Sequence, residues 1–291
     1  MPSLKDLKNR IGSVKSTQKI TSAMKMVAAA KLRKAQEQAI ASRPYSENMQ
    51  KIVTNLSKKI SSNAPYLITG NPNKNKIQLL VVFSADRGLC GGFNSSITRL
   101  VKSEITIANK NGFQTKLLLV GRKAADALRR DFGDKFLEVI TGKSANPKFS
   151  DSNLISKKIL DYFFDEQFGT CKIIFNKFIS AITQEVTIQS IIPISVDDKD
   201  DSLSETNYVY EYEPNEEEIL EDILIRNITT QLFGAQIEST ASELAARMTA
   251  MDNATRNAGD LIDRLTLQYN RTRQAFITKE LIEIISGAEA L

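Results

Sequence analysis

Histidine is absent from the 291 residues, and cysteine occurs only at Cys90 and Cys171. Without histidine the chain lacks the usual general base, the Ser-His and Cys-His nucleophile pairs and the commonest metal ligand. Two cysteines are too few for a disulfide framework or a zinc site, and they fit a reducing compartment. We therefore expect no catalytic residue, no cofactor and no metal site.

Long apolar runs are also missing. No stretch reaches the roughly 20 apolar residues of a membrane-spanning helix, and the start Met1-Pro2-Ser3-Leu4 has no hydrophobic signal core. We expect a soluble protein that reaches a membrane only through partners. Ser3, with Asp6 three residues later, predicts the N-cap of a helix.

The two ends of the chain each predict one long helix. Mostly apolar and small residues in residues 1–60 recur in alternating steps of three and four from Leu4 to Ile60, which is a heptad pattern with a weak middle that includes Gln18 and Lys25. Residues 215–291 continue the rule. The positions of this second seam, which has polar breaks at Thr240 and Arg247, are Phe233, Ile237, Thr240, Leu244, Arg247, Met251, Ala254, Ala258, Leu261 and Leu265.

Each seam needs a partner, and the other end of the chain is the nearest candidate. Small residues in both helices predict a thin antiparallel coiled coil; they are Ala28, Ala29 and Ala30 in the first and Ala241, Ala245, Ala246, Ala250, Ala254 and Ala258 in the second. Pro44 is the expected site of a bend in the first helix. The predicted segments are a coiled-coil helix at 1–60, a linker at 61–76, an α/β body at 77–214 and a second coiled-coil helix at 215–291.

Charge is divided unevenly between these segments. Residues 1–60 hold 13 Lys and Arg against 3 acids, net +10, whereas residues 215–291 hold 7 against 13, net −6. The opposite signs favour pairing of the two helices, although each exposed ion pair is weak. A basic helix also predicts an acidic partner.

The middle of the chain alternates strand and helix signals. Strands are predicted at 77–83, 116–120, 136–140, 171–179 and 186–194, and helices at 95–109, 122–131 and 151–168. This alternation predicts a small α/β sheet flanked by helices.

A glycine-rich loop, Asp86-Arg87-Gly88-Leu89-Cys90-Gly91-Gly92-Phe93-Asn94, follows the first strand. A dinucleotide fold would place its phosphate-binding turn here, but the glycine spacing matches neither common phosphate motif and no Lys follows. We expect Gly88, Gly91 and Gly92 to permit a tight turn and close backbone approach. Cys90 is expected to be a small packed residue, since no histidine can activate it.

Three strings resemble the gamma subunit of rotary ATP synthases, in family order and over nearly the whole chain. The first is Lys19-Ile20-Thr21-Ser22-Ala23-Met24-Lys25-Met26-Val27-Ala28-Ala29-Ala30-Lys31, and the second is the loop from Asp86 to Asn94. The third begins Ala246-Arg247-Met248-Thr249-Ala250-Met251 and continues through Tyr269-Asn270 and Arg273-Gln274 to Ile284-Ile285-Ser286-Gly287.

The resemblance implies a non-catalytic central stalk of a proton- or sodium-driven ATP synthase. Its helices would stand inside the hexamer of alpha and beta subunits, and its α/β body would lie near the membrane-embedded c-ring and the epsilon subunit. Rotation would couple ion flow to ATP synthesis at the cytoplasmic face of a bacterial membrane.

The resemblance also implies contact residues. The positions facing the catalytic subunits would be Met24, Arg247, Arg273, Gln274, Thr278 and Glu280. Tyr210, Tyr212 and Glu213 would contact the polar loops of the membrane ring. Other readings of the residues are a seam filler for Met24, a residue paired with nearby acids for Arg247, and an edge strand for 210–214.

Two other classes of function stay open from the residues alone. One is a nucleotide-dependent enzyme that uses the glycine loop, and the other is a basic coiled-coil scaffold for nucleic acid. The basic helix has few aromatic residues to stack on bases, and its heptad seam already commits one face. The stalk interpretation instead predicts a defined complex with other subunits.

Overall fold

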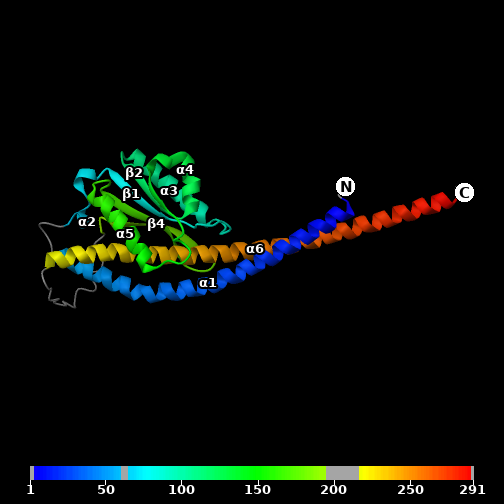
Figure 1. The fold of residues 1–291 in the computed structure, drawn as a ribbon, viewed down its shortest axis with the longest axis horizontal. Coiled ribbons are helices and arrows are strands. Elements are labelled where there is room, and N and C mark those ends of the chain that lie inside the picture. Colours follow the sequence, from blue (N-terminus) through cyan, green and yellow to red (C-terminus); the bar gives the residue numbers. More distant parts are fainter. Residues whose placement is uncertain (1–2, 60–64, 195–215, 290–291) are drawn as a thin grey trace. The chain divides into compact units, whose positions relative to one another are not determined.

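The computed structural model describes residues 3–59, 65–194 and 216–289. Two long helices begin and end the described chain, and an α/β sheet lies between them in sequence (Figure 1). The long helices are α1 (Leu4–Lys59) and α6 (Glu216–Glu289). The elements between them are α2 (Tyr66–Thr69), η1 (Pro72–Lys74), β1 (Ile77–Phe83), α3 (Phe93–Lys110), β2 (Gln114–Val120), α4 (Arg122–Phe132), η2 (Gly133–Lys135), β3 (Phe136–Ile140), α5 (Phe149–Phe164), β4 (Thr170–Phe178) and β5 (Gln184–Ile192).

The five strands form one sheet in the order β3-β2-β1-β4-β5. The first four are parallel to their neighbours, and β5 pairs antiparallel with β4. The chain runs from β1 outwards to β3 and then returns to the other side of β1. This reversal places the loop that follows β1 at a switch point of the sheet, where α/β proteins commonly position functional loops.

Alternate residues of each buried strand face opposite layers of helix. Leu80 and Val82 of β1 pack with the residues of α3 and α4, whereas Leu79 and Val81 pack with α5 and α6. Strands buried on both faces read as continuous apolar runs, as Leu79 to Phe83 does. The predicted strands and helices of the body are confirmed, with ends shifted by up to four residues.

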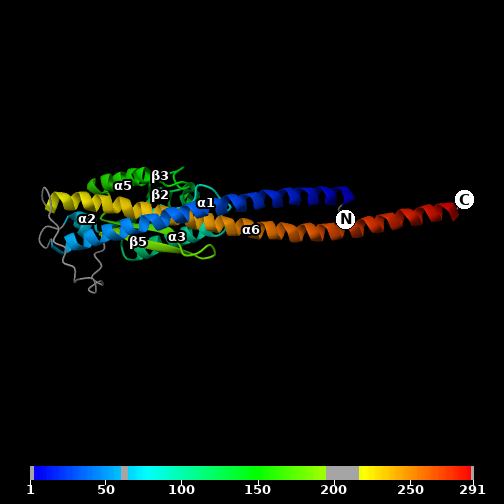
Figure 2. The ribbon, with the colours of Figure 1, turned by 90° about the horizontal axis from the view of Figure 1, so that it is seen from below.

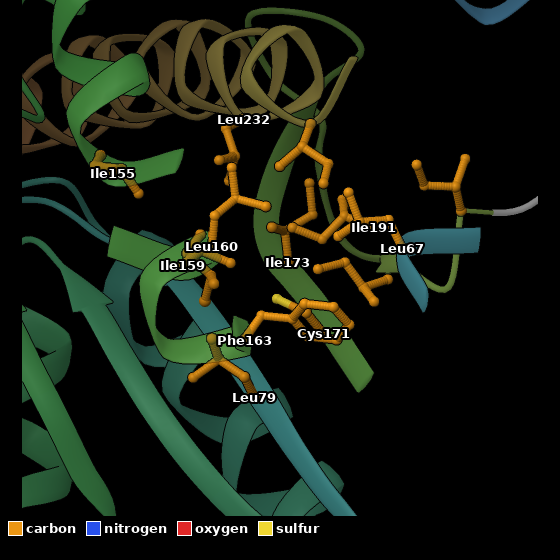
Figure 3. Close-up of a cluster of buried hydrophobic side chains, with 14 of the residues drawn as sticks. Leu67, Leu79, Ile155, Ile159, Leu160, Phe163, Cys171, Ile173, Ile191 and Leu232 are labelled. Atoms are coloured by element: carbon orange, nitrogen blue, oxygen red, sulfur yellow. The ribbon is translucent and has the colours of Figure 1, made fainter. Parts of the chain in front are cut away.

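The first part of α6 belongs to the core of the sheet. Leu220, Leu224, Ile228 and Leu232 are at most 1% exposed and share a cluster with Ile173 of β4 and side chains of α5. Figure 3 shows Leu232 in this cluster together with Leu160 and Ile173. The heptad reading that began at Phe233 missed this role. Its signal is the four-residue spacing of these side chains, which forms a stripe on one helix face.

Contacts divide the chain into two compact units, Met1–Ala30 with Arg247–Leu291, and Lys31–Ala246. The division passes through both long helices, whereas the segments of the sequence analysis follow the helix ends. The sheet and the first part of α6 lie in the second unit. We call the first unit the paired-helix unit.

In the paired-helix unit the two helices run antiparallel, as predicted (Figure 2). Lys25 Nζ donates to Asp252 Oδ1 at 2.6 Å, and Thr255 Oγ1 donates to Thr21 Oγ1 at 2.8 Å. The numbers rise along one helix as they fall along the other. The predicted fold class, an α/β body with a long antiparallel coiled coil, is therefore confirmed.

The first seam is also confirmed, because every predicted position from Leu4 to Val53 is buried or half-buried. Ser3 caps α1 as expected, accepting the backbone N–H of Asp6 at 3.2 Å. The second seam is wrong at Leu261, which is 38% exposed. Ile262 is half-buried in its place, so the repeat takes a step of four residues after Ala258 where a step of three was predicted.

Within the described residues, no helix is sufficiently long and apolar to cross a bilayer. The same residues contain no group of three or more His, Cys, Asp or Glu side chains that could hold a metal ion.

Candidate functional site

The glycine-rich loop turns sharply at two residues with left-handed backbone conformations, Leu89 (φ 65°) and Gly91 (φ 55°). The expectation of close backbone approach is wrong for Gly88 and Gly92, because a Cβ at either would meet no atom closer than 3.8 Å. The close approach lies instead at Gly121 after β2, where a Cβ would come within 2.1 Å of Ser84 O. Glycine is thus required at position 121, because the ends of β1 and β2 leave no room for a side chain there.

The polar groups of this loop are used to hold the loop itself. Asn94 Oδ1 accepts the backbone N–H of Ala85 at 3.1 Å, and Asn94 Nδ2 donates to Cys90 Sγ at 3.1 Å. Cys90 is 2% exposed, as expected for a small packed residue. Both cysteines are free thiols, and burial raises the pKa of the Cys171 thiol well above its ordinary value. Neither thiol therefore has the environment of a reactive nucleophile.

Asp86 connects this loop to the two neighbouring strand ends. Its carboxylate accepts the backbone N–H of Arg122 at 3.2 Å, the backbone N–H of Gly142 at 3.0 Å and the Ser144 hydroxyl at 2.7 Å. Arg122 is the first residue of α4, so the carboxylate lies where the helix N-terminus favours negative charge. The Asp86 carboxylate therefore supplies the negative charge at the start of α4.

The loop at 141–147 carries the connection on to α6. Thr240 Oγ1 donates to the carbonyl of Ser144 at 2.9 Å, and Gln236 Nε2 donates to the carbonyl of Lys143 at 2.7 Å. Gln236 Oε1 also accepts the hydroxyl of Ser152 on α5 at 2.9 Å. We call Asp86, Ser144, Gln236 and Thr240 the polar network.

Sequence reasoning missed the role of the polar network. Thr240 was noted only as a polar break in the second seam, and Gln236 and Ser144 carried no expectation. The available signal was the spacing of two polar residues, Gln236 and Thr240, which are four apart and therefore lie on one face of α6. Their acceptors lie about 95 residues away in sequence, so no local pattern identifies them.

Electrostatics also joins the two helices of the paired-helix unit. The hydrogen bond from Lys25 lowers the pKa of Asp252 below its ordinary value, and the charge of Arg256 adds to the effect. Arg256 lies one turn away and donates to Asp252 Oδ2 at 2.7 Å. Lys25, one of the basic residues of the first helix and a position of its predicted seam, therefore pairs the two helices.

The far end of α6 is exposed on all sides. From Arg273 to Ala288 every side chain is exposed, including large apolar ones. The large apolar side chains in this stretch, each at least 48% exposed, are Phe276, Ile277, Leu281, Ile282, Ile284 and Ile285. Clustered exposed apolar side chains mark interaction surfaces.

Comparisons with known proteins identify the family. The family model described as ATP synthase matches residues 3–291. The chain is 51% identical over 294 residues to the ATP synthase gamma chain of Pelagibacter ubique and 53% identical over 296 residues to that of Paramagnetospirillum magneticum, with both chains fully covered in each case. The chain belongs to the ATP synthase gamma chain family.

Solved structures agree with this assignment. A chain from the central stalk and c-ring structure of Tetrahymena thermophila mitochondrial ATP synthase is 29% identical, with a TM-score of 0.62, and the match covers 81% of this chain and 99% of that one. A chain of the Euglena gracilis mitochondrial ATP synthase has a TM-score of 0.69 at 21% identity, covering 99% and 94%, which supports the fold. The resemblance drawn from three sequence strings is confirmed. Gamma chains are rotor subunits of the central stalk and are not themselves catalytic.

The predicted contact residues have the following positions in this gamma-family chain. Met24 and Arg247 are half-buried in the paired-helix unit. The remaining predicted positions facing the catalytic subunits are all exposed on α6: Arg273, Gln274, Thr278 and Glu280. Thr278 Oγ1 donates to the carbonyl of Gln274 at 2.9 Å, which leaves the Gln274 side chain available. Tyr210, Tyr212 and Glu213 lie outside the described residues.

Proposed function

We propose that the paired-helix unit turns inside a hexamer of alpha and beta subunits and couples ion flow through a membrane c-ring to their conformational cycle. The observation that carries this proposal is the combination of an antiparallel helix pair with an α6 end whose apolar side chains are exposed. Such an end needs an apolar surrounding, since it exposes too much apolar surface for a free tip in water. A ring of subunits around one helix would supply it.

Rotation of a shaft with unlike faces can bias identical subunits in turn. A partner subunit changes its equilibrium only if it contacts the shaft differently in its open and closed states. The paired-helix unit carries different kinds of side chain around its axis. These include the carboxylate of Asp252, which pairs with Lys25, the exposed basic side chains of Lys15 and Lys19, and the half-buried, apolar Met24. The unit is therefore asymmetric around its axis.

We assign two groups of contacts to this role. Met24, Arg247 and the set Arg273, Gln274, Thr278 and Glu280 would face the catalytic subunits; the exposure of the last four leaves their polar groups able to bind a partner. Tyr210, Tyr212 and Glu213 would contact the c-ring, with the epsilon subunit beside the α/β body. The chain would be a peripheral part of this complex, at the cytoplasmic face of a bacterial membrane.

Purification through a tag on this chain tests the proposal. We expect one copy of the chain with three alpha and three beta subunits, and a bead attached to the chain should rotate while the immobilised hexamer hydrolyses ATP. Recovery of the chain without these subunits, or ATP hydrolysis with a stationary bead, would refute the rotor role. ATP binding by the isolated chain that is lost on changing Gly91 and Gly92 would support the nucleotide-dependent alternative instead.

A further inference from the structure

A cavity of about 300 Å³ lies in the unit formed by residues 31–246. Three segments line it, namely α1, the 145–147 loop and α6. Ala35, Ile237 and Leu244 contribute apolar surface, and Lys31 and Lys34 contribute positive charge. The volume is at the lower end of the range for small-molecule sites, so a small ligand is the appropriate occupant.

The two lysines are available for a ligand. They are three residues apart on α1, so their side chains lie on the same side of the helix. Among the described residues neither makes an ion pair, whereas nearby Arg33 pairs with Glu37 at 3.3 Å and Lys25 pairs with Asp252 at 2.6 Å. The cavity therefore combines an apolar wall with uncompensated positive charge at one side.

The hydroxyl group of Thr240, which also lines the cavity, is already used. Thr240 Oγ1 donates to the carbonyls of Ser144 and Gln236, so its hydroxyl proton is committed. An apolar ligand without charge would leave the lysines unused, and a compact polyanion would leave the apolar wall bare. A ligand with one anionic group and a short hydrocarbon chain satisfies both parts.

We propose that this cavity binds an amphipathic monoanion of the class of medium-chain fatty-acid carboxylates. The carboxylate lies between the ammonium groups of Lys31 and Lys34, and the alkyl chain packs against Ala35, Ile237 and Leu244. Bound ligand touches α1, α6 and the 145–147 loop together, so it stabilises the folded form of this unit. The inference uses only this cavity and does not rest on the rotor role.

Calorimetric titration of the full-length chain with decanoate, decanol and inorganic phosphate tests the proposal. We expect saturable binding of one decanoate per chain, at least about tenfold weaker binding of decanol because it lacks the charge, and no binding of phosphate. The double variant Lys31→Gln/Lys34→Gln should weaken decanoate binding by about tenfold. Ala35→Met should weaken it by filling the cavity while keeping both charges.

The matched control is Lys8→Gln/Lys15→Gln, which removes the same charge from exposed positions of α1 outside the cavity. It should leave decanoate binding unchanged, and circular dichroism verifies that each variant retains its helix content. Equal loss in both double variants, equal binding of decanol and decanoate, or uptake that does not saturate would each overturn the proposal. All four lysines are exposed, so the comparison between the two double variants does not depend on whether the Ala35→Met variant folds.

Discussion

A single carboxylate holds three segments of the α/β body together. Asp86 accepts hydrogen bonds from the start of α4, from Gly142 and from Ser144, and Ser144 in turn binds α6 through Thr240. Bonds to a charged acceptor are stronger than those between neutral groups, and removing the acceptor leaves its donors unsatisfied. Asp86 therefore affects a larger part of the fold than its position in a loop indicates.

Asp86→Ala should lower the free energy of unfolding by about 1.5–3 kcal/mol, because the N–H groups of Arg122 and Gly142 lose their charged acceptor. Urea unfolding followed by circular dichroism measures the change. Asp134→Ala is the control, because this substitution removes the same charge from an exposed position. Equal stability of the two variants would show that the Asp86 bonds contribute nothing net.

The Lys25–Asp252 pair makes the stability of the paired-helix unit depend on pH. Because the folded pKa of Asp252 lies below 3.8, ionised Asp252 favours the folded state. Its contribution is complete above pH 3.8 and disappears as pH falls through the lower folded-state pKa. Asp252→Asn should therefore lower the melting temperature at neutral pH, with a difference from wild type that vanishes in strong acid.

The control for this titration is Asp260→Asn, because Asp260 is exposed on the same helix. Its melting temperature should follow wild type throughout the pH series. A constant difference between Asp252→Asn and wild type from neutral to strongly acidic pH would contradict the assignment of the effect to the ionised carboxylate.

At the scale of the elements, α6 has two structural roles along one continuous helix. Its first part completes the core of the sheet, and its later part pairs with α1. A helix that is apolar around most of its circumference is buried on several sides. Residues 239–245 are buried on all sides although four of the seven, Ser239, Thr240, Ser242 and Glu243, are polar.

Leu232→Ala should destabilise the chain by about 2–5 kcal/mol, because Leu232 is fully buried in the core shared with β4 and α5. Leu261→Ala removes the same atoms from a position that is 38% exposed on the same helix, and should change stability by at most about 0.5 kcal/mol. Urea unfolding compares them. Similar losses would mean that α6 is not part of the body's core.

The close packing of the helix pair depends on one small residue more than on its neighbours. Ala28 is 2% exposed, whereas Ala30 is exposed, although both were predicted to lie among the small residues between the helices. Ala28→Leu should cost about 1–3 kcal/mol through overpacking, and Ala30→Leu should be nearly neutral. Thermal melting distinguishes the two variants. Equal tolerance of both would show that the helices can separate to admit a larger side chain.

The sequence predicted most of these elements because their signals are local. Strands such as β1 are uninterrupted apolar runs, and the seam of α1 repeats every seven residues over its whole length. The misses arose where position depends on distant partners. Leu261 was misplaced by one residue in the repeat, and the polar network joins residues that no periodicity relates.

At the scale of the whole molecule, some charged residues pair the two long helices, and other charged residues are exposed and available to partner subunits. The excess of basic residues in 1–60 and of acidic residues in 215–291 is used in part at Lys25 and Asp252, while exposed lysines such as Lys15 and Lys19 stay available. The family and the rotor role were recognisable from three strings. The contact residues were not derivable in this way, because a partner's surface is absent from the chain's own sequence.

The exposed end of α6 permits a control that separates apolar contact from charge. Ile284→Ser/Ile285→Ser should lower the yield of complex with alpha and beta subunits, because both side chains are more than half exposed and need an apolar surrounding. Lys279→Gln/Glu283→Gln removes an exposed ion pair from the same region and should leave the yield unchanged. Gel filtration of the complex measures both yields. Equal yields would mean that the apolar end makes no contact in the assembly.

Deletion of residues 284–291 extends the same argument to function. The segment carries no group that makes or breaks bonds in the proposed role, so its removal should reduce assembly or torque while an already assembled hexamer continues to hydrolyse ATP. Rotation of a loaded bead measures torque, and phosphate release measures hydrolysis by the same purified complex. Reduced torque with retained phosphate release is the expected result, because the shaft loses surface against its sleeve and the catalytic subunits keep their chemistry. Loss of hydrolysis from the assembled hexamer would show that the α6 end acts directly in catalysis, and the assignment of this segment would then be wrong.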